Sequence, residues 1–329
     1  MPTKNRVNGK QPTANATPAS PTAKPSNNGN PLSNSDRLRK LYASLLRCRR
    51  LQECIRDASE ATGSNYELTI GHEAVVVGAT ADLDNEDTIV ASPRNVNALL
   101  ARGVPLDVLL SQTSHVGTVE RYLAQHAIEG PFHAGVGIAV AHMLEKKRNV
   151  VVAFAPPGKA TIAAWHSALQ FAAQHKLRIV FVIENGFAAG TDSQESYLEA
   201  VSFMARDCGL PGIIVDGQDV VAVWRVAQEA IRHARDGSGP TLIDCRTDPV
   251  RDPLSHMQRY LRKRNQWDDD WSRQLEREIR ESLEQVLSAR APQPPQGRPQ
   301  SREQALLRKQ LPAGKTKDKH RGQVDRTDG

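Results

Sequence analysis

The chain alternates short apolar runs with longer segments in which apolar residues recur every three or four positions. Apolar runs of strand length stand at 88–92, 150–154, 179–183, 213–215 and 241–245. Apolar residues at helical spacing occupy 38–55, 75–81, 163–173, 220–235 and 272–288, and a further apolar helix rich in small residues is expected at 134–141. Strands that alternate with helices predict parallel pairing, because two parallel strands need a crossover connection. We therefore expect an α/β fold with a doubly wound, mostly parallel sheet.

The clearest unit of this pattern runs from Asn149 to Thr191. Its first strand breaks at Pro156-Pro157-Gly158, and after a helix its second strand ends at Glu184-Asn185-Gly186-Phe187. Both turns follow the carboxyl ends of strands, which is where open α/β sheets bind their ligands. We therefore expect the functional site at these two turns. Residues 111–132, just before this unit, have little pattern and are expected to form a surface connection.

Charge and composition divide the chain into three parts. The net charge of +6 comes from the two ends, since residues 1–34 contain no acidic residue and residues 289–329 contain more basic than acidic ones. Both ends are rich in polar residues and proline and poor in large apolar residues, so we expect them to be disordered. The sequence predicts a disordered tail at 1–34, one domain at 35–288 and a disordered basic tail at 289–329.

Several classes of protein are disfavoured by the composition. Only the tails are basic, and no aromatic residues are interleaved with their charges, which argues against nucleic-acid binding. There is no run of about 18 apolar residues to cross a membrane and no apolar signal core, so a cytoplasmic protein is expected. The four cysteines form no CxxC pair and no zinc-type spacing, and we expect buried free thiols: Cys48, Cys54, Cys208 and Cys245.

A set of short stretches recurs in one order along the chain. They include Ile70-Gly71-His72-Glu73-Ala74, Trp165 to Ala173, Phe181 to Asn185, Gly209-Leu210-Pro211-Gly212 and Val215 to Asp219. Together they resemble the alpha subunit of the thiamine-diphosphate-dependent 2-oxo acid dehydrogenases of the pyruvate and branched-chain type, over residues 36–288. The resemblance implies the thiamine-diphosphate-binding fold, with thiamine diphosphate and Mg²⁺ as cofactors. It also implies a beta-type partner subunit in a heterotetramer, or a homo-oligomer, and a lipoyl-bearing acyltransferase component.

The same resemblance indicates where the cofactor would bind. The family has a Gly-Asp-Gly turn and an Asn-Asn-Gly turn, which supply a carboxylate and an amide oxygen to the metal. Here Pro157 replaces the carboxylate and offers neither a ligand nor an N–H donor, while the second turn is one residue shorter and keeps a single asparagine. The resemblance assigns cofactor binding to Arg94, Gly158, Lys159, Asn185 and Phe187, metal binding to Asn185, and a catalytic role to no residue.

Two further positions depart from the family pattern. Val96 stands where the family has a histidine, and the segment from Arg246 to Pro253 lacks most of a loop that carries a histidine and an arginine near the cofactor. Arg94 keeps the position that grips a phosphate oxygen. Lys159 could replace part of the metal's charge at a helix start, although a solvated lysine is the simpler interpretation.

The remaining polar candidates favour structural roles. We expect His72 to shape a helix start, His133 to be buried and hydrogen-bonded, and His166 to pack within its helix. Ser193 and Ser196 have no histidine and aspartate at triad-like positions, which argues against nucleophilic catalysis.

Two functions from different classes follow from these observations. The first is a non-catalytic relative that keeps the fold for assembly with a beta-type chain or with itself, because the metal carboxylate and the histidine loop are missing. The alternative is an active 2-oxo acid dehydrogenase subunit with atypical cofactor binding, which would decarboxylate a 2-oxo acid and pass the acyl group to a lipoyl domain. A third, weaker hypothesis gives the basic tails a docking role on an acidic partner.

Overall fold

The structure is a computed structural model, and it describes residues 35–62, 69–91, 95–106, 109, 130–155, 159–186, 203–248 and 250–289. The side chains of residues 58, 59, 61, 62, 159–164 and 289 are not among the parts described. The disorder expected at 1–34 and beyond Ala289 lies outside the described residues and stays a prediction.

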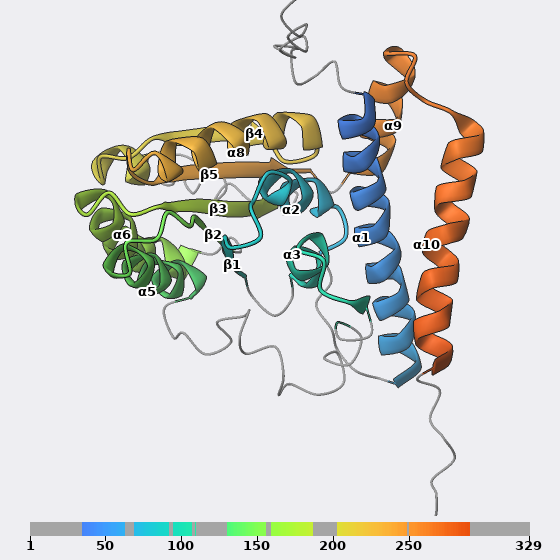
Figure 1. The fold of residues 1–329 in the computed structure, drawn as a ribbon, viewed down its shortest axis with the longest axis horizontal. Coiled ribbons are helices and arrows are strands. Elements are labelled where there is room, and N and C mark those ends of the chain that lie inside the picture. The colour runs from blue at the N-terminus through green and yellow to red at the C-terminus, as the bar shows by residue number, and fades with distance from the viewer. Residues whose placement is uncertain are drawn as a thin grey trace, which may run out of the picture.

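Five parallel strands form the sheet at the centre of the fold (Figure 1). They are β1 (Thr88–Val90), β2 (Val151–Ala155), β3 (Ile179–Gly186), β4 (Gly212–Asp216) and β5 (Thr241–Thr247). Their order in the sheet is β1-β2-β3-β5-β4, and every neighbouring pair is parallel. The expectation of a parallel α/β fold is therefore confirmed.

Helices cover both faces of the sheet, which explains why its strands are apolar on both sides. Alternate residues of β2 point to opposite faces, so that Val151 and Ala153 join one core while Val152 and Phe154 join the other. The first core contains α5 (Pro131–Leu144) and α6 (Lys159–Gln174), and the second contains α2 (Glu73–Thr80) and α8 (Val220–Arg235). The sheet is thus doubly wound.

A layer of helices lies beside the second core. It contains α1 (Ser35–Thr62), α3 (Val96–Ala101), α9 (Pro253–Lys263) and α10 (Asp269–Ala289), and α1 and α10 run side by side (Figure 1). The apolar stripe of α1 is buried as its spacing predicts, with Leu38, Leu45 and Leu51 fully enclosed. Arg49 follows the buried Leu45 by four residues and also lies inward, with only 15% of its side chain exposed.

Two aspartates fix the helices that start at the carboxyl edge of the sheet. Asp219 caps α8 by accepting the backbone N–H groups of Val221 and Ala222, and Asp252 caps α9 by accepting that of Ser255. A capping side chain of this kind satisfies donors that the helix leaves unpaired, which contributes about 1 kcal/mol. These caps hold both helix starts next to the ends of β4 and β5.

Two boundaries differ from the sequence predictions. The helix α5 begins at Pro131, inside the expected connection at 111–132, because Phe132 is buried against Trp165 and Phe181 with ring centroids 4.9 and 4.8 Å apart. Residues 111–129 of that connection lie outside the described part. The strand β3 continues through Gly186, where a turn was expected from Glu184, because its last residues pair with β5. In the described residues no helix is long and apolar enough to cross a membrane.

Candidate functional site

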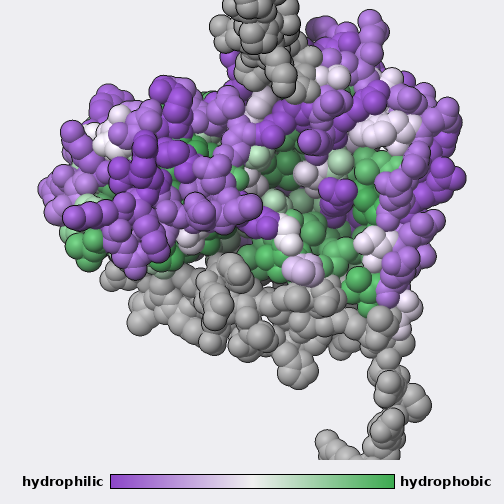
Figure 2. Space-filling model, viewed as in Figure 1, coloured by the Kyte–Doolittle hydropathy of each residue, from purple (hydrophilic) through white to green (hydrophobic). Residues whose placement is uncertain are grey.

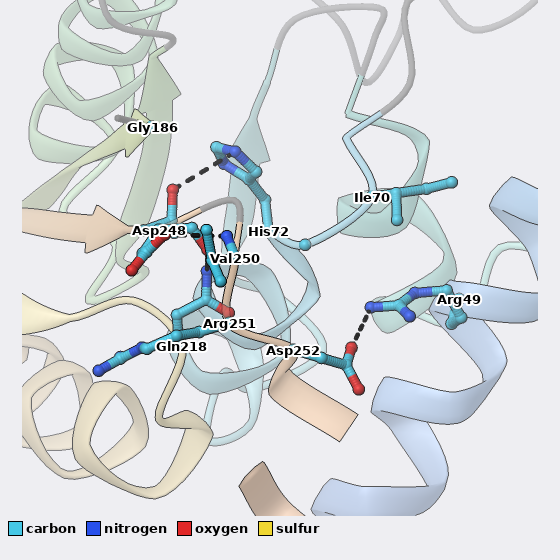
Figure 3. A pocket seen from close by; sticks show the side chains of 11 residues that line it. Arg49, Ile70, His72, Gly186, Gln218, Asp248, Val250, Arg251 and Asp252 are labelled. Carbon is cyan, nitrogen blue, oxygen red and sulfur yellow. Dashed lines mark hydrogen bonds and ion pairs between the residues drawn. The ribbon is translucent and has the colours of Figure 1, made fainter. Parts of the chain in front are cut away.

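A pocket of about 340 Å³ lies at the carboxyl edge of the sheet (Figure 3). It is bounded by α1, by the turn before α2, by the end of β3, by the turn between β4 and α8, and by the segment from β5 to α9. Its lining residues are Arg49, Ile70, Gly71, His72, Gly186, Gln218, Thr247, Asp248, Val250, Arg251 and Asp252. The pocket therefore reaches the second of the two turns at which the sequence predicts a ligand.

The turn before α2 brings a histidine to the pocket. Gly71 has a φ of 96°, which strongly favours glycine, and its N–H donates to Oε2 of Glu73 at 2.9 Å. This bend directs His72 toward β5, where its Nε2 lies 3.4 Å from the hydroxyl of Thr247 (Figure 3). His72 thus lines the pocket in addition to shaping the helix start.

A buried carboxylate anchors one wall of the pocket. The side chain of Glu73 is fully enclosed, and it accepts hydrogen bonds from Nε and Nη2 of Arg49 at 2.5 and 3.2 Å. The same guanidinium reaches Asp252 at 2.8 Å (Figure 3). Burial favours the neutral form of Arg49, but the hydrogen bonds to these two carboxylates outweigh it and raise the pKa of the guanidinium. The positive charge of Arg49 is therefore fully committed to the protein.

The second arginine of the pocket is also paired, because Arg251 forms an ion pair with Asp216 at the end of β4. Among the described lining residues the two guanidinium groups are matched by two carboxylates, those of Asp248 and Asp252, so the formal charge of this lining is zero before His72 is counted. Because both arginines are already paired, the described lining offers no unpaired Lys or Arg to a multiply charged anion such as a diphosphate.

The last residues of β3 point to opposite faces of the sheet. Gly186 lies on the pocket side, where a Cβ atom would come within 3.2 Å of the imidazole of His72. Asn185 points to the other face and is only 3% exposed. The pocket therefore receives no side chain from the end of β3, and a larger residue at 186 would displace His72.

Asn185, the predicted metal ligand, forms a hydrogen bond inside the sheet. Its Nδ2 donates to Oδ1 of Asp244 at 3.0 Å, and Nε of Arg246 lies 3.2 Å from the other oxygen of that carboxylate. The charge of Asp244 is therefore offset by Arg246, and the amide oxygen is the atom of the Asn185 side chain that could still coordinate a metal ion. Across the described residues, no group of three His, Cys, Asp or Glu side chains could hold a metal ion.

The other predicted cofactor residues are not tested by the structure. Arg94, Gly158 and Phe187 lie outside the described residues, as do Pro157 and the two serines at 193 and 196. Lys159 opens α6, but its side chain lies outside the described part. The assignment of these positions to thiamine diphosphate stays a prediction.

Buried polar pairs near the site were not anticipated. Glu184 is 1% exposed and accepts a hydrogen bond of 2.8 Å from Nδ2 of Asn95, while Asp244 occupies the middle of an apolar strand. An acidic residue inside an apolar strand was a usable signal, because a buried carboxylate needs partners. The identity of those partners depends on residues far away along the chain.

The two histidines of the opposite face are both hydrogen-bonded. Nε2 of His133 lies 3.0 Å from the hydroxyl of Ser167, and Nε2 of His166 lies 2.8 Å from Asp207. His166 has 40% of its side chain exposed, so the expectation that it packs within its helix is wrong; Trp165, its neighbour, is buried there instead. His133 is half-buried and hydrogen-bonded, which confirms its bonding but not full burial.

The four cysteines are free, as expected, and three of them are buried. Burial raises the pKa of the Cys48 and Cys245 thiols, so both stay protonated at neutral pH. Cys54 is only half-buried, which corrects the expectation of burial for all four.

Comparison with known proteins agrees with this architecture. The model of the family described as "Dehydrogenase E1 component" matches residues 46–251. The alpha subunit of the acetoin:2,6-dichlorophenolindophenol oxidoreductase of Bacillus subtilis is 29% identical over 63% of this chain and 68% of its own length. The mitochondrial 2-oxoisovalerate dehydrogenase subunit alpha of Homo sapiens is 26% identical, over 79% of this chain and 69% of its own. The pyruvate dehydrogenase E1 component subunit alpha of Rhizobium meliloti is 27% identical, over 74% and 82%. The chain therefore belongs to the dehydrogenase E1 component family, and its resemblance to the alpha subunits of the thiamine-diphosphate-dependent 2-oxo acid dehydrogenases is confirmed.

Proposed function

We propose that this chain is a non-catalytic alpha-type subunit, which keeps the fold of its family for assembly with a beta-type subunit. The observation that carries the proposal is the charge of the pocket at the carboxyl edge. Its two arginines are paired with carboxylates, and the formal charge of its described lining is zero. A diphosphate bound beside Gly186 would therefore find no unpaired Lys or Arg among the described lining residues, whereas a cofactor site needs free donors and cations.

The metal site gives independent support. A Mg²⁺ ion that bridges to phosphate needs near-octahedral oxygen coordination with charged ligands. The side chain of Pro157 supplies none, and Asn185 offers a single uncharged amide oxygen, because its Nδ2 donates to Asp244. The described residues do not fit the Mg²⁺ complex of thiamine diphosphate, and we derive no reaction step through it.

The surface of α5 supports the assembly role. This helix has no charged residue from Pro131 to Leu144, yet Gly137 and Ala141 are exposed and Leu144 is 73% exposed. A glycine within a helix costs about 1 kcal/mol relative to alanine. At the neighbouring Gly135 a Cβ atom would lie only 3.0 Å from Ala153, so packing on the sheet requires a glycine there. At Gly137 a Cβ atom would have no neighbour within 4 Å. Close packing of a partner subunit's backbone on α5 would account for a glycine at position 137 and for the exposed apolar residues beside it.

Calorimetric titration of the full chain, alone and assembled with a beta-type subunit, tests the non-catalytic role. We expect that titration with thiamine diphosphate gives no Mg²⁺-dependent binding heat that is due to this chain. We also expect that the assembled complex releases no CO₂ from pyruvate or branched 2-oxo acids. An alpha subunit with an intact Gly-Asp-Gly turn serves as the positive control. Metal-dependent binding, or turnover in the complex, would favour the alternative of an active subunit with atypical cofactor binding.

Light scattering of the complex tests the assembly role. The substitution Leu144→Glu places a charge on the exposed face of α5, so we expect it to weaken assembly. The matched control is Leu287→Glu, which alters a leucine that is 39% exposed on α10. Equal assembly by both variants would exclude α5 as the interface.

A further inference from the structure

A groove with an apolar floor runs along α1 on the side of the molecule away from α5. It contains two adjoining hollows of about 400 and 130 Å³. The larger lies between α1 and the ends of α2 and α3, and the smaller lies between α1, α3 and α10. Residues 37, 40, 41, 44 and 47 of α1 line them at spacings of three and four, so both hollows lie along one face of this helix. We call the two together the α1–α3 groove.

The floor of the groove is apolar and its edge is basic. Leu41, Leu83 and Leu100 contribute to the floor, and Figure 2 shows an apolar surface in the middle of this face, bordered by hydrophilic side chains. The charged residues that line the groove are Arg37, Lys40, Arg47, Arg102 and Glu278. Among the described lining residues, four cations face a single carboxylate, so this part of the groove is complementary to an acidic ligand.

Two of these cations are held by the protein itself. Arg37 forms an ion pair with Asp82, and Arg102 donates to the backbone carbonyls of the turn at 83–87. Lys40 and Arg47 are exposed, and within the described part of the chain neither forms an ion pair or a hydrogen bond. They differ in this from Arg49 and Arg50 of the same helix, which are both paired. Lys40 and Arg47 are therefore the charges available to a partner.

Their spacing indicates the shape of that partner. Arg47 lies seven positions after Lys40, which corresponds to about 10 Å along a helix. An amphipathic helix that lies along the groove would meet this spacing with acidic residues at positions i and i+7 and apolar residues at i+3 and i+4.

We propose that the α1–α3 groove binds an amphipathic, acidic segment of a partner polypeptide, with its apolar side on Leu41 and Leu100 and its carboxylates on Lys40 and Arg47. This inference does not depend on the proposed function, because the groove and the pocket at the sheet edge share no lining residue.

Fluorescence anisotropy with a labelled helical peptide tests the proposal. The probe carries glutamate at i and i+7 and leucine at i+3 and i+4, and a second peptide carries glutamine in place of both glutamates. We expect the full chain to bind the acidic peptide, and the binding to weaken with salt. The glutamine peptide should bind about 2- to 30-fold more weakly, because it loses two exposed ion pairs. The double variant Lys40→Glu/Arg47→Glu should bind the acidic peptide more weakly still, because it adds repulsion between like charges.

The matched control is Arg225→Glu/Lys263→Glu, which makes the same change of charge at two exposed positions outside the groove. Circular dichroism verifies that both double variants are folded. The proposal is overturned if the acidic peptide does not bind, if both peptides bind equally, or if the two double variants bind alike. Light scattering of the free chain adds a further outcome: a dimer that only the groove variant disrupts would show that a second copy occupies the groove instead.

Discussion

Replacing Arg49 with methionine removes the partner of a fully buried carboxylate. In the native protein Glu73 accepts two hydrogen bonds from Arg49, at 2.5 and 3.2 Å, and one from the N–H of Gly71 at 2.9 Å. After the substitution only the hydrogen bond from Gly71 remains among those described. The side chain of Glu73 is 0% exposed, so water cannot replace the lost donors without opening the pocket wall.

The expected loss is large for a single substitution. A buried charge left without its partner costs about 3–5 kcal/mol of unfolding free energy. For a domain of this size, that loss lowers the melting temperature by roughly 6–20 °C. The attraction within the pair does not set this number, because most of the cost is the burial of a carboxylate that has lost its counter-charge.

Urea unfolding of the full chain at pH 7, followed by circular dichroism, measures the effect. The double variant Arg49→Met/Glu73→Met removes both charges and should recover most of the loss, since apolar pairs often replace buried ion pairs without penalty. The variant Asp252→Asn removes the outer partner, which is 37% exposed, and should cost less than about 1 kcal/mol because asparagine can still cap α9. A loss below about 1 kcal/mol for Arg49→Met, or an equal loss for the double variant, would refute this reasoning.

Four further predictions concern packing, a buried polar pair and pH. Gly78→Ala should cost about 1–3 kcal/mol of unfolding free energy, because a Cβ there would lie 2.7 Å from a side chain of α8; an unchanged melting temperature would contradict this. Gly137→Ala should instead stabilise the isolated chain by about 1 kcal/mol, since its Cβ would meet nothing within 4 Å, and a lower melting temperature would contradict it. Asn185→Ala removes a donor from a buried carboxylate and should cost about 1–3 kcal/mol in urea unfolding; a change below 0.5 kcal/mol, about the error of such a measurement, would contradict the pairing. Partial burial opposes ionisation of Asp252, but hydrogen bonds from its neighbours lower its pKa below the ordinary 3.8. The ionised Asp252 therefore stabilises the folded state above pH 3.8, and this stabilisation is lost as the pH falls through the pKa of the folded state. The stability difference between the native chain and Asp252→Asn should therefore vanish in acid, and a difference that persists there would contradict the assignment.

The sequence by itself determined the class of fold. The apolar residues of α1 recur at helical spacing and are buried, and the apolar runs of β2 and β5 are strands. These predictions succeed because the repeat of a helix or a strand is a local property, and burial on both faces makes most positions of a central strand apolar. The order of short motifs identified the family for the same reason, since each motif lies within one turn or one helix.

The tertiary structure decided the chemistry of the site. The sequence placed Asn185 in a turn as a metal ligand, but pairing with β5 extends the strand and turns its amide toward Asp244, 59 residues away. Arg49 lies four residues after the buried Leu45 and therefore on the inner face of its helix, but its partners Glu73 and Asp252 come from distant parts of the chain. Which face a side chain takes at a strand end, and which buried charge an arginine reaches, depend on elements that meet only in the fold. The local pattern therefore specifies the scaffold, whereas the charge of the pocket at its edge follows from long-range contacts.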